Sequence, residues 1–551
     1  MENCLDYLLS LCCCCGCYSA YRHYDDDLYE PLLLDTEREA VKDLLNYLNR
    51  ECEEKPTISE ERLEALCTLT YSENADLQRS AALCLAEISE RLMQPITTKV
   101  MEPILVLMES HDVETQKAAS LALSNFALCG HESNKSLIVK CGALPVLIKL
   151  LSSKNVEIQC NACGCITTLA TSNTNKMAIV SCNGVPPLIS LTSSPTFGCN
   201  ATRLAPLLNL THIDSNRTVL VNHGAVSTFM TLLQSRDTDI QYYCAAALSN
   251  LAVDAKHRVA VVREGNHQVI RLLINLLSSP ADKVKCQACF ALRNLASDDE
   301  NQVAIVKLNG LPPLLSIIRN SSKETLSAAI AALRNLSIHR LNEIPILEHG
   351  FLEEIAVVLR QPMLWDAHCH AAGTLRNLAA GSKTSMILTS GALDGLITVF
   401  LESTSPASVQ TEVTAALAII AGHDEAKRVL LGIGDGRVFS RLVNLAACSP
   451  SRDVQYNSAG TIGQLALFSL PPELISANIS MLQKYLTRFL RSSDAGFIHI
   501  SLWTIVHLLK SEAFRTAFGE SSLPKLVDTI LTSSHSAQLK QLAQTVLDNM
   551  G

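Results

Sequence analysis

The most reactive side chains of the 551-residue chain lie at its N-terminus, where six cysteines occur within 17 residues. They are Cys4, Cys12, Cys13, Cys14, Cys15 and Cys17. A cysteine thiol can carry a fatty acid as a thioester, and each acyl methylene buried in a bilayer contributes about 0.8 kcal/mol. Leu8, Leu9 and Leu11 add further apolar contact. The pattern favours palmitoylation and predicts that residues 1–35 form a flexible, Cys-rich membrane anchor.

Other interpretations of this cysteine segment are weaker. A secretory signal would need a basic start, whereas Glu2 and Asp6 precede the first basic residue, Arg22. A zinc site would need ligands that converge on one tetrahedral ion, and four consecutive cysteines cannot do this. His23 is the only nearby imidazole. A redox or metal role and an unmodified tail remain alternatives, but we expect no bound metal.

A second set of side chains recurs at regular spacing and could bind a polypeptide. Asparagine occupies the same place in ALSNFA, LLNLTH, ALSNLA, ALRNLA, ALRNLS and TLRNLA, at Asn125, Asn209, Asn250, Asn294, Asn335 and Asn377. A carboxamide offers two donors and an acceptor, so a column of them can bond the main chain of an extended peptide. The alternative is that these asparagines cap or bridge neighbouring repeats.

Arginine precedes asparagine in three consecutive LRN motifs, at Arg293, Arg334 and Arg376. Equal placement in neighbouring repeats predicts one electropositive strip for an acidic or carbonyl-rich extended segment. Charge-assisted hydrogen bonds of about 1.5–3 kcal/mol each would dominate the affinity.

Other motifs carry less weight. No Ser/His/Asp or paired-carboxylate constellation stands at a fixed spacing, so we expect no catalytic residue and no cofactor. GIGDG at Gly432–Gly436 imitates a phosphate loop, but no strand precedes it. His368 and His370 would point about 200° apart on a helix, so they cannot share a metal ion. YEPL at Tyr29–Leu32 has the form of a tyrosine-based sorting signal, a pattern that is common by chance.

The elements that must position these side chains are short helices in a repeating array. A glycine followed by an apolar segment recurs every 40 to 45 residues, at Gly142, Gly184, Gly224, Gly265, Gly310, Gly350 and Gly391. Before Gly310, one helical stripe is formed by Val284, Ala288, Ala291, Leu292 and Leu295, which places Arg293 and Asn294 outward. A fixed period near 40 indicates stacked units that bury their apolar sides against one another.

About eleven last-helix motifs run from LQRSAALCLAEI to HISLWTIVHLL, and LKQLAQTVLDNM would close a twelfth. They predict an all-α armadillo-repeat, right-handed superhelical solenoid of about 11–12 repeats, covering residues 36–551 as one domain. Thr36 and Glu39 fit a capping box at the start of its first helix. That helix would bury Val41, Leu44, Leu45 and Leu48.

Composition agrees with such an array. The chain is 48% hydrophobic, yet it has no uninterrupted apolar run of about 18 residues. A net charge of −9 and an aromatic content of 5% argue against nucleic-acid binding. Fifteen of the 21 cysteines lie beyond residue 17, and many fall on or beside apolar stripes, such as Cys84, Cys163, Cys165, Cys244 and Cys289. We expect these thiols to pack as small apolar groups in a reducing compartment.

Several segments resemble the vacuolar protein 8 family of lipid-anchored armadillo proteins over residues 36–510. They include DTEREAVKDLLNYL, VEIQCNACGCITTLA, DIQYYCAAALSNLAVD, VKCQACFALRNLASD and LRNLSIHRLNE. The resemblance implies that Arg293, Arg334 and Arg376 hold partner peptides. It also implies an adaptor on the cytoplasmic face of a vacuolar or lysosomal membrane, with roles in vacuole inheritance, vacuole fusion, nucleus-vacuole contact and autophagy. Glu2 stands where members of that family carry a myristoylated glycine, so we expect cysteine acylation and no myristate. A second departure from the family is that the chain stops just after the array.

The sequence therefore predicts a membrane-tethered scaffold that binds extended segments of partner proteins, with self-association left open. The alternative is a catenin-like signalling or importin-like transport armadillo protein. An importin would pair tryptophan with groove asparagine in many repeats, whereas this chain has only Trp365 and Trp503. A catenin would carry a broadly basic groove.

Overall fold

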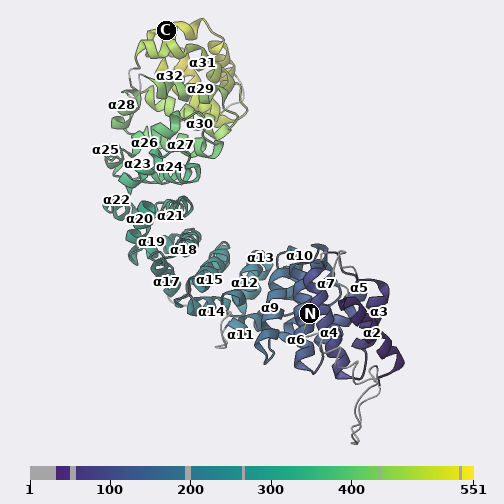
Figure 1. Cartoon of the computed structure of the whole chain (residues 1–551). Helices are drawn as coiled ribbons and strands as arrows, with labels where there is room; N and C mark the ends of the chain where they lie inside the picture. The colour runs from purple at the N-terminus through teal and green to yellow at the C-terminus, as the bar shows by residue number, and fades with distance from the viewer. Residues whose placement is uncertain are drawn as a thin grey trace, which may run out of the picture. The chain divides into compact units, whose positions relative to one another are not determined.

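The computed structural model describes residues 33–49, 58–92, 94–192, 200–263, 267–432, 436–468, 470–532 and 536–550. Every regular element within these ranges is a helix (Figure 1), which confirms the all-α prediction. No helix in these ranges combines the length and the apolar character that crossing a membrane requires.

The chain divides into two compact units, residues 1–266 and 267–551. The described helices of the first unit are α2 (Asp35–Asn49), α3 (Glu60–Thr70), α4 (Ala75–Arg91), α5 (Thr98–Met108), α6 (Val113–Leu128), α7 (Ser133–Lys140), α8 (Ala143–Leu150), α9 (Val156–Leu169), α10 (Asn173–Ser181), α11 (Val185–Thr192), α12 (Asn200–Leu210), α13 (Asp214–Asn222), α14 (Ala225–Leu232), α15 (Thr238–Leu251) and α16 (Ala255–Arg263).

The second unit continues the same order of short and long helices. Its described helices are α17 (Gln268–Leu276), α18 (Asp282–Leu295), α19 (Asp299–Lys307), α20 (Leu311–Asn320), α21 (Lys323–Leu336), the 3₁₀ turn η1 (Arg340–Asn342), α22 (Glu343–Glu348), α23 (Phe351–Arg360), α24 (Trp365–Ala379), α25 (Thr384–Thr389), α26 (Ala392–Leu401), α27 (Ala407–Ile420), α28 (Asp424–Gly432), α29 (Arg437–Cys448), α30 (Arg452–Leu465), α31 (Pro472–Leu490), α32 (Ala495–Leu508), α33 (Glu512–Gly519), α34 (Leu523–Thr532) and α35 (Ala537–Asp548).

A typical repeat has three helices, as in α19, α20 and α21, and the third is the longest. All twelve predicted last-helix motifs lie on the last helices of their repeats, which we call third helices even where a repeat has only two. They are α4, α6, α9, α12 and α15 in the first unit, and α18, α21, α24, α27, α30, α32 and α35 in the second. Within the second unit α18 packs on α21, α21 on α24, and α24 on α27. These third helices therefore form a continuous row.

The predicted helical phase of residues 282–295 is confirmed. The side chains of the stripe are all at most 1% exposed: Val284, Ala288, Ala291, Leu292 and Leu295. Arg293 and Asn294 on the same helix are half-buried and reach the surface. The five thiols predicted to pack in repeat interiors, Cys84, Cys163, Cys165, Cys244 and Cys289, are buried. Burial raises the pKa of the Cys165 thiol to about 12, so that thiol is held in its unreactive neutral form.

The start of the first described helix differs from the prediction. α2 begins at Asp35, so Thr36 lies inside the helix and the Thr36–Glu39 capping box is wrong. Glu37 supplies the cap instead, because its carboxylate accepts a hydrogen bond of 2.9 Å from the Leu34 backbone N–H. Val41 and Leu44 are buried as predicted, while the side chains of Leu45 and Leu48 lie outside the described set.

The recurring glycines serve two different purposes. Gly142 adopts a left-handed φ of 80°, as do Gly224, Gly350 and Gly391 at 78° to 79°. Before Gly184 and Gly310 the left-handed residue is instead an asparagine, Asn183 or Asn309. A Cβ on Gly184 would lie 2.8 Å from the Ile179 carbonyl oxygen, so glycine is required there for space. Gly265 lies outside the described residues, and Gly436, with φ of 84°, extends the series by one repeat.

One repeat of the second unit lacks a separate first helix. The single 19-residue helix α31 stands where the preceding repeat has both α28 and α29. Pro471 is its N-cap and Pro472 is its first residue. Proline is tolerated at the first helical position because the backbone N–H that it lacks would make no hydrogen bond within the helix there. This difference leaves a hollow beside the ends of α30 and α32, described below.

Candidate peptide-binding site

Five of the six predicted asparagines bridge consecutive third helices. Each carboxamide nitrogen donates to a backbone or hydroxyl oxygen about one repeat earlier in the chain. The pairs are Asn125 to Ser89 Oγ (3.1 Å), Asn209 to the Thr167 carbonyl (3.3 Å), Asn250 to Thr211 Oγ1 (2.8 Å), Asn335 to the Arg293 carbonyl (2.9 Å) and Asn377 to the Arg334 carbonyl (3.1 Å). The bridging alternative thus accounts for the amide nitrogen of each of these five side chains. The oxygens of these five carboxamides accept no hydrogen bond from the described residues, so they are available to a ligand.

The second and third predicted arginines meet at one carboxylate, Glu412 on α27. Arg334 Nη2 lies 2.5 Å from Glu412 Oε1, and Arg376 Nη1 lies 2.8 Å from Glu412 Oε2. The side chain of Glu412 is 16% exposed, against 25% for Arg334 and 33% for Arg376. One partly covered carboxylate therefore joins arginines from two successive repeats and offsets part of their charge.

Glu412 was not among the site residues predicted from the sequence, although its position within the repeat could have indicated it. It lies two residues after Gln410, whose side chain donates to the Ser405 carbonyl and ties the third helix to the chain before it. In the preceding repeat the same place is held by His370, two residues after His368. In the following repeat Asn457 holds it and donates weakly to the Thr411 carbonyl (3.4 Å). Side chains at this place reach back toward the previous third helix.

The room for Arg334 comes from Gly373 on α24. A Cβ on Gly373 would collide with Arg334 Nε and would lie 2.9 Å from Arg334 Cδ. The glycine in HAAGTLRNLA thus lets the guanidinium lie across the third-helix row toward Glu412. The sequence alone does not indicate a role for this glycine, since it lies in the middle of a helix and outside the recurring Gly-apolar motif.

The first predicted arginine has a different setting. Among the described residues Arg293 has no carboxylate within ion-pair distance. It borders a hollow of about 420 Å³ whose other walls include Phe290, Trp365 and His370. Met363, at the rim, is 76% exposed. The hollow combines an available cation with aromatic and thioether surface, which suits an apolar side chain beside a hydrogen-bond acceptor.

His370 is neutral at physiological pH. Burial, followed by the positive charges of Arg293 and Arg334, lowers the pKa of His370 to about 4. Its Nδ1 is buried without a hydrogen-bond partner among the described residues. The imidazole therefore contributes polar surface to the site without adding charge.

His368 and His370 do not form a metal site. His368 Nε2, on α24, lies 3.1 Å from the Val358 carbonyl of α23 in the interior of the repeat, in the structural role that Gln410 plays one repeat later. The described residues contain no group of three or more His, Cys, Asp or Glu side chains placed to hold a metal ion.

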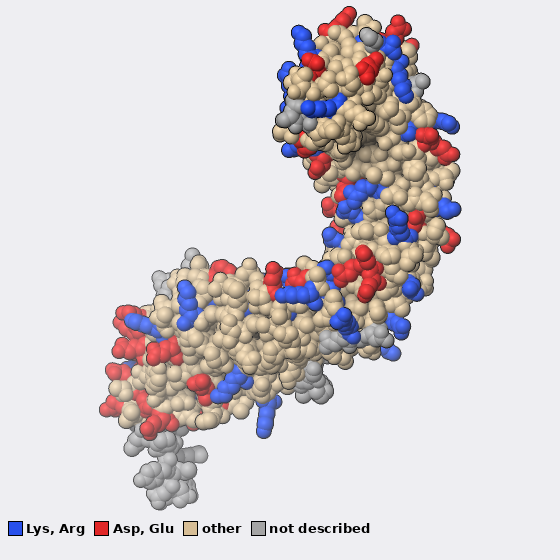
Figure 2. All heavy atoms as spheres, turned by 180° about the vertical axis from the view of Figure 1, so that it is seen from behind, with Lys and Arg blue, Asp and Glu red and all other residues tan. Residues whose placement is uncertain are grey.

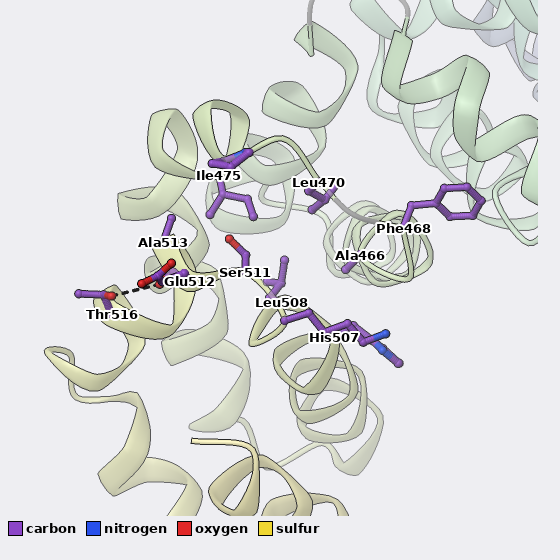
Figure 3. A pocket seen from close by; sticks show the side chains of 12 residues that line it. Ala466, Phe468, Leu470, Ile475, His507, Leu508, Ser511, Glu512, Ala513 and Thr516 are labelled. Carbon is purple, nitrogen blue, oxygen red and sulfur yellow. Dashed lines mark hydrogen bonds between the residues drawn. The ribbon is translucent and has the colours of Figure 1, made fainter. Parts of the chain in front are cut away.

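A second hollow, of about 600 Å³, lies where the repeat of α31 lacks its own first helix. Figure 3 shows Leu470, Ile475 and Leu508 around it, with Ser511 and Ala513 from the start of α33. Its walls are mainly apolar, and it contains none of the predicted site residues.

Charged side chains are unevenly spread. Figure 2 shows acidic residues gathered over the N-terminal helices of the first unit, where α2 opens with Asp35 and Glu37 and α3 with Glu60 and Glu61. This end does not offer the basic surface that phosphate binding requires. The six N-terminal cysteines and YEPL at Tyr29–Leu32 lie outside the described residues.

Comparison with known proteins agrees with the repeat architecture. The family model of the armadillo/beta-catenin-like repeat matches residues 131–171, 214–253, 263–297 and 298–338. One similar solved structure, an engineered protein, has a TM-score of 0.64 at 26% identity and covers 83% of this chain and 99% of its own. Another, from a study of a phosphorylation switch in the interaction between cadherin and beta-catenin, has a TM-score of 0.65. It is 16% identical, covers 88% of this chain and 98% of its own, and supports the fold alone.

Curated relatives identify the family more closely. Vacuolar protein 8 of Schizosaccharomyces pombe is 43% identical over 514 residues, which are 92% of each chain. Vacuolar protein 8 of Saccharomyces cerevisiae is 41% identical over 504 residues, covering 90% of this chain and 85% of the relative. Proteins of this armadillo type are protein-binding scaffolds and not enzymes. With this level of identity over nearly its whole length, the chain belongs to the vacuolar protein 8 family of armadillo-repeat scaffolds.

Proposed function

We propose that the third-helix row formed by α18, α21, α24 and α27 binds extended segments of partner proteins. The observation that carries this proposal is the placement of Arg293, Arg334 and Arg376 at equal positions of three consecutive repeats, all three half-buried. We use the name arginine strip for these three side chains.

The arginine strip and the asparagines offer complementary bonding groups. Each guanidinium has five N–H donors, and Arg334 and Arg376 each use one of them on Glu412. The carboxamide oxygens of Asn335 and Asn377 accept nothing from the described residues. Donors and acceptors side by side can bond the carbonyls and N–H groups of an extended main chain whatever its side chains are. This refines the asparagine prediction, because the oxygen and not the nitrogen would contact the ligand.

We further propose that the scaffold is held on the cytoplasmic face of a vacuolar or lysosomal membrane by palmitoylation of its N-terminal cysteines. Support comes from the six clustered thiols and from the vacuolar names of the relatives. A tethered scaffold with an exposed peptide-binding row could serve in vacuole inheritance, vacuole fusion, nucleus-vacuole contact and autophagy. No specific observation favours catenin-like signalling or importin-like transport, since the similarity to the cadherin–beta-catenin structure is at 16% identity and supports the fold alone.

The test of peptide binding replaces Arg293, Arg334 and Arg376 together by Ala in the full chain. Partners recovered with the wild type should be lost, with affinities reduced by about a hundredfold or more. Affinity capture followed by calorimetry on the recovered partner segments measures this.

A matched control exists in the same three repeats. Arg271, Arg319 and Arg360 lie on the second helices α17, α20 and α23, so their triple replacement removes the same charge from another surface. This control should keep every partner. Unchanged affinity in the strip variant, with native helicity by circular dichroism, would show that these arginines are only solvated surface.

A further inference from the structure

We propose that Glu412 tunes the specificity of the arginine strip by weakening the preference of its Arg334–Arg376 half for acidic side chains relative to uncharged acceptors, such as main-chain carbonyls. This inference rests on the peptide-binding function proposed above. It decides between the acidic and the carbonyl-rich segments that the arginines alone would both accept.

The contacts of Glu412 hold its carboxylate beneath the two arginines. Its two oxygens each hold a different guanidinium, at 2.5 Å to Arg334 and 2.8 Å to Arg376. It is also the most covered of the three side chains, at 16% exposure. A ligand approaching from solvent therefore meets the outer N–H groups of the arginines, with the carboxylate still bound beneath them.

A fixed carboxylate discriminates by charge. A ligand carboxylate that accepted from Arg334 or Arg376 would lie about 5 Å from the Glu412 carboxylate, where repulsion weakens binding by about fourfold in a water-like dielectric. A neutral carbonyl in the same position suffers no such repulsion and still receives a charge-assisted hydrogen bond.

The surroundings of Arg293, at the other end of the arginine strip, also carry a net charge close to zero. Around its hollow Arg293 and Lys323 are accompanied by Glu324 and Asp366. His370, between Arg293 and Arg334, is uncharged at neutral pH. The hollow also presents Phe290, Met363 and Trp365 to a side chain of the ligand. The ligand class is therefore an extended, largely uncharged segment with a large apolar residue near Arg293, and not a polyacidic tract.

The experiment uses the full-length protein and two synthetic peptides of about ten residues, enough to span three repeats in extended form. Both carry the same leucines and serines, and one has glutamate where the other has glutamine. We expect the wild type to show little preference for the glutamate peptide over the glutamine peptide. In Glu412→Gln the ratio of the two dissociation constants should shift toward the glutamate peptide by about fourfold, with a steeper salt dependence of glutamate-peptide binding.

Two further variants separate charge selection from a structural role. Glu412→Asp keeps the charge and should keep the wild-type ratio. Glu353→Gln removes one exposed carboxylate from the second helix α23 and should also leave the ratio unchanged. A Glu412→Gln ratio equal to that of the wild type overturns the inference.

The outcomes also distinguish this inference from the peptide-binding proposal. If both peptides bind and the triple arginine variant loses them, but Glu412→Gln leaves their ratio unchanged, only the role of Glu412 is wrong. If neither peptide binds the wild type, or the triple arginine variant retains both at unchanged affinity, peptide binding by the strip and the role of Glu412 fail together.

Discussion

Neighbouring residues of α18 have opposite roles, because a helix turns each successive side chain by about 100°. Leu295 is 1% exposed and packs in the interior of its repeat, whereas Arg293 reaches the surface. The residue that carries function thus sits two positions from one that carries stability. Substitutions at these two positions of α18 should therefore affect partner binding and folding stability separately.

Leu295→Ala should lower the free energy of unfolding by about 2–5 kcal/mol, since it removes buried apolar contacts and leaves a cavity. Arg293→Ala should lower it by less than about 0.5 kcal/mol, because that side chain has no ion pair among the described residues. Thermal unfolding and hydrogen exchange of α18 measure both changes. Damage in a solenoid spreads first to adjacent repeats, so exchange should rise in α21 as well as α18 for the leucine variant. Equal thermal shifts for the two variants would contradict the observed helix phase.

The connection between a first and a second helix is the element that sets the repeat spacing. At Gly142 the backbone is left-handed, and a Cβ there would meet no atom within 4 Å beyond the adjoining residues, so the requirement is conformational. At Gly184 the left-handed residue is Asn183, and the glycine N–H bonds the Ile179 carbonyl at 3.0 Å. The requirement there is space, as expected for the position after a left-handed helix cap.

These two requirements predict different responses to asparagine, which tolerates the left-handed region but carries a Cβ. Gly142→Asn should cost less than about 1 kcal/mol of unfolding free energy. Gly184→Asn should cost about 1–3 kcal/mol, because its Cβ would lie 2.8 Å from a backbone oxygen. Chemical denaturation of the two variants, in adjacent repeats of the same unit, provides the comparison. A smaller loss at Gly184 than at Gly142 would show that the close approach to Ile179 is not what demands glycine.

At the scale of the whole molecule, the proposed membrane attachment assigns the anchor to residues 1–35. The described helices include none with the length and apolar character needed to cross a bilayer. Replacing Cys4, Cys12, Cys13, Cys14, Cys15 and Cys17 by Ser should abolish hydroxylamine-sensitive acylation and move the protein from the membrane fraction to the soluble fraction. One substitution should have little effect, because neighbouring acyl chains are partly redundant.

The control for the anchor uses exposed thiols of the array. Cys129, Cys182 and Cys448 are exposed and free, so their replacement by Ser tests whether any accessible cysteine can be acylated. This control should keep full membrane recovery. Undiminished recovery and acylation in the six-cysteine variant would place the anchor elsewhere in the chain.

Local patterns were sufficient to determine the repeat, because an armadillo unit is built from contacts near in sequence. The apolar stripe of residues 282–295, the recurring glycines and the twelve third helices all follow from spacing, since each helix buries one face against its neighbours. The cap of α2 was misplaced because Thr36 and Asp35 are both plausible starts, and the Glu37 carboxylate decided between them.

The chemistry of the strip was decided only by tertiary structure. Spacing placed Arg293, Arg334 and Arg376 in register but treated them as equivalent cations. Stacking brings Glu412 to Arg334 across 78 positions of sequence and leaves Arg293 beside Trp365 and His370. The electrostatic interaction of a charged group depends on its neighbours in three dimensions. The spacing of residues along one helix does not predict a contact with a carboxylate two repeats away. Helical periodicity therefore predicts which way the side chains face, whereas the stacking of repeats decides which charged groups neutralise one another.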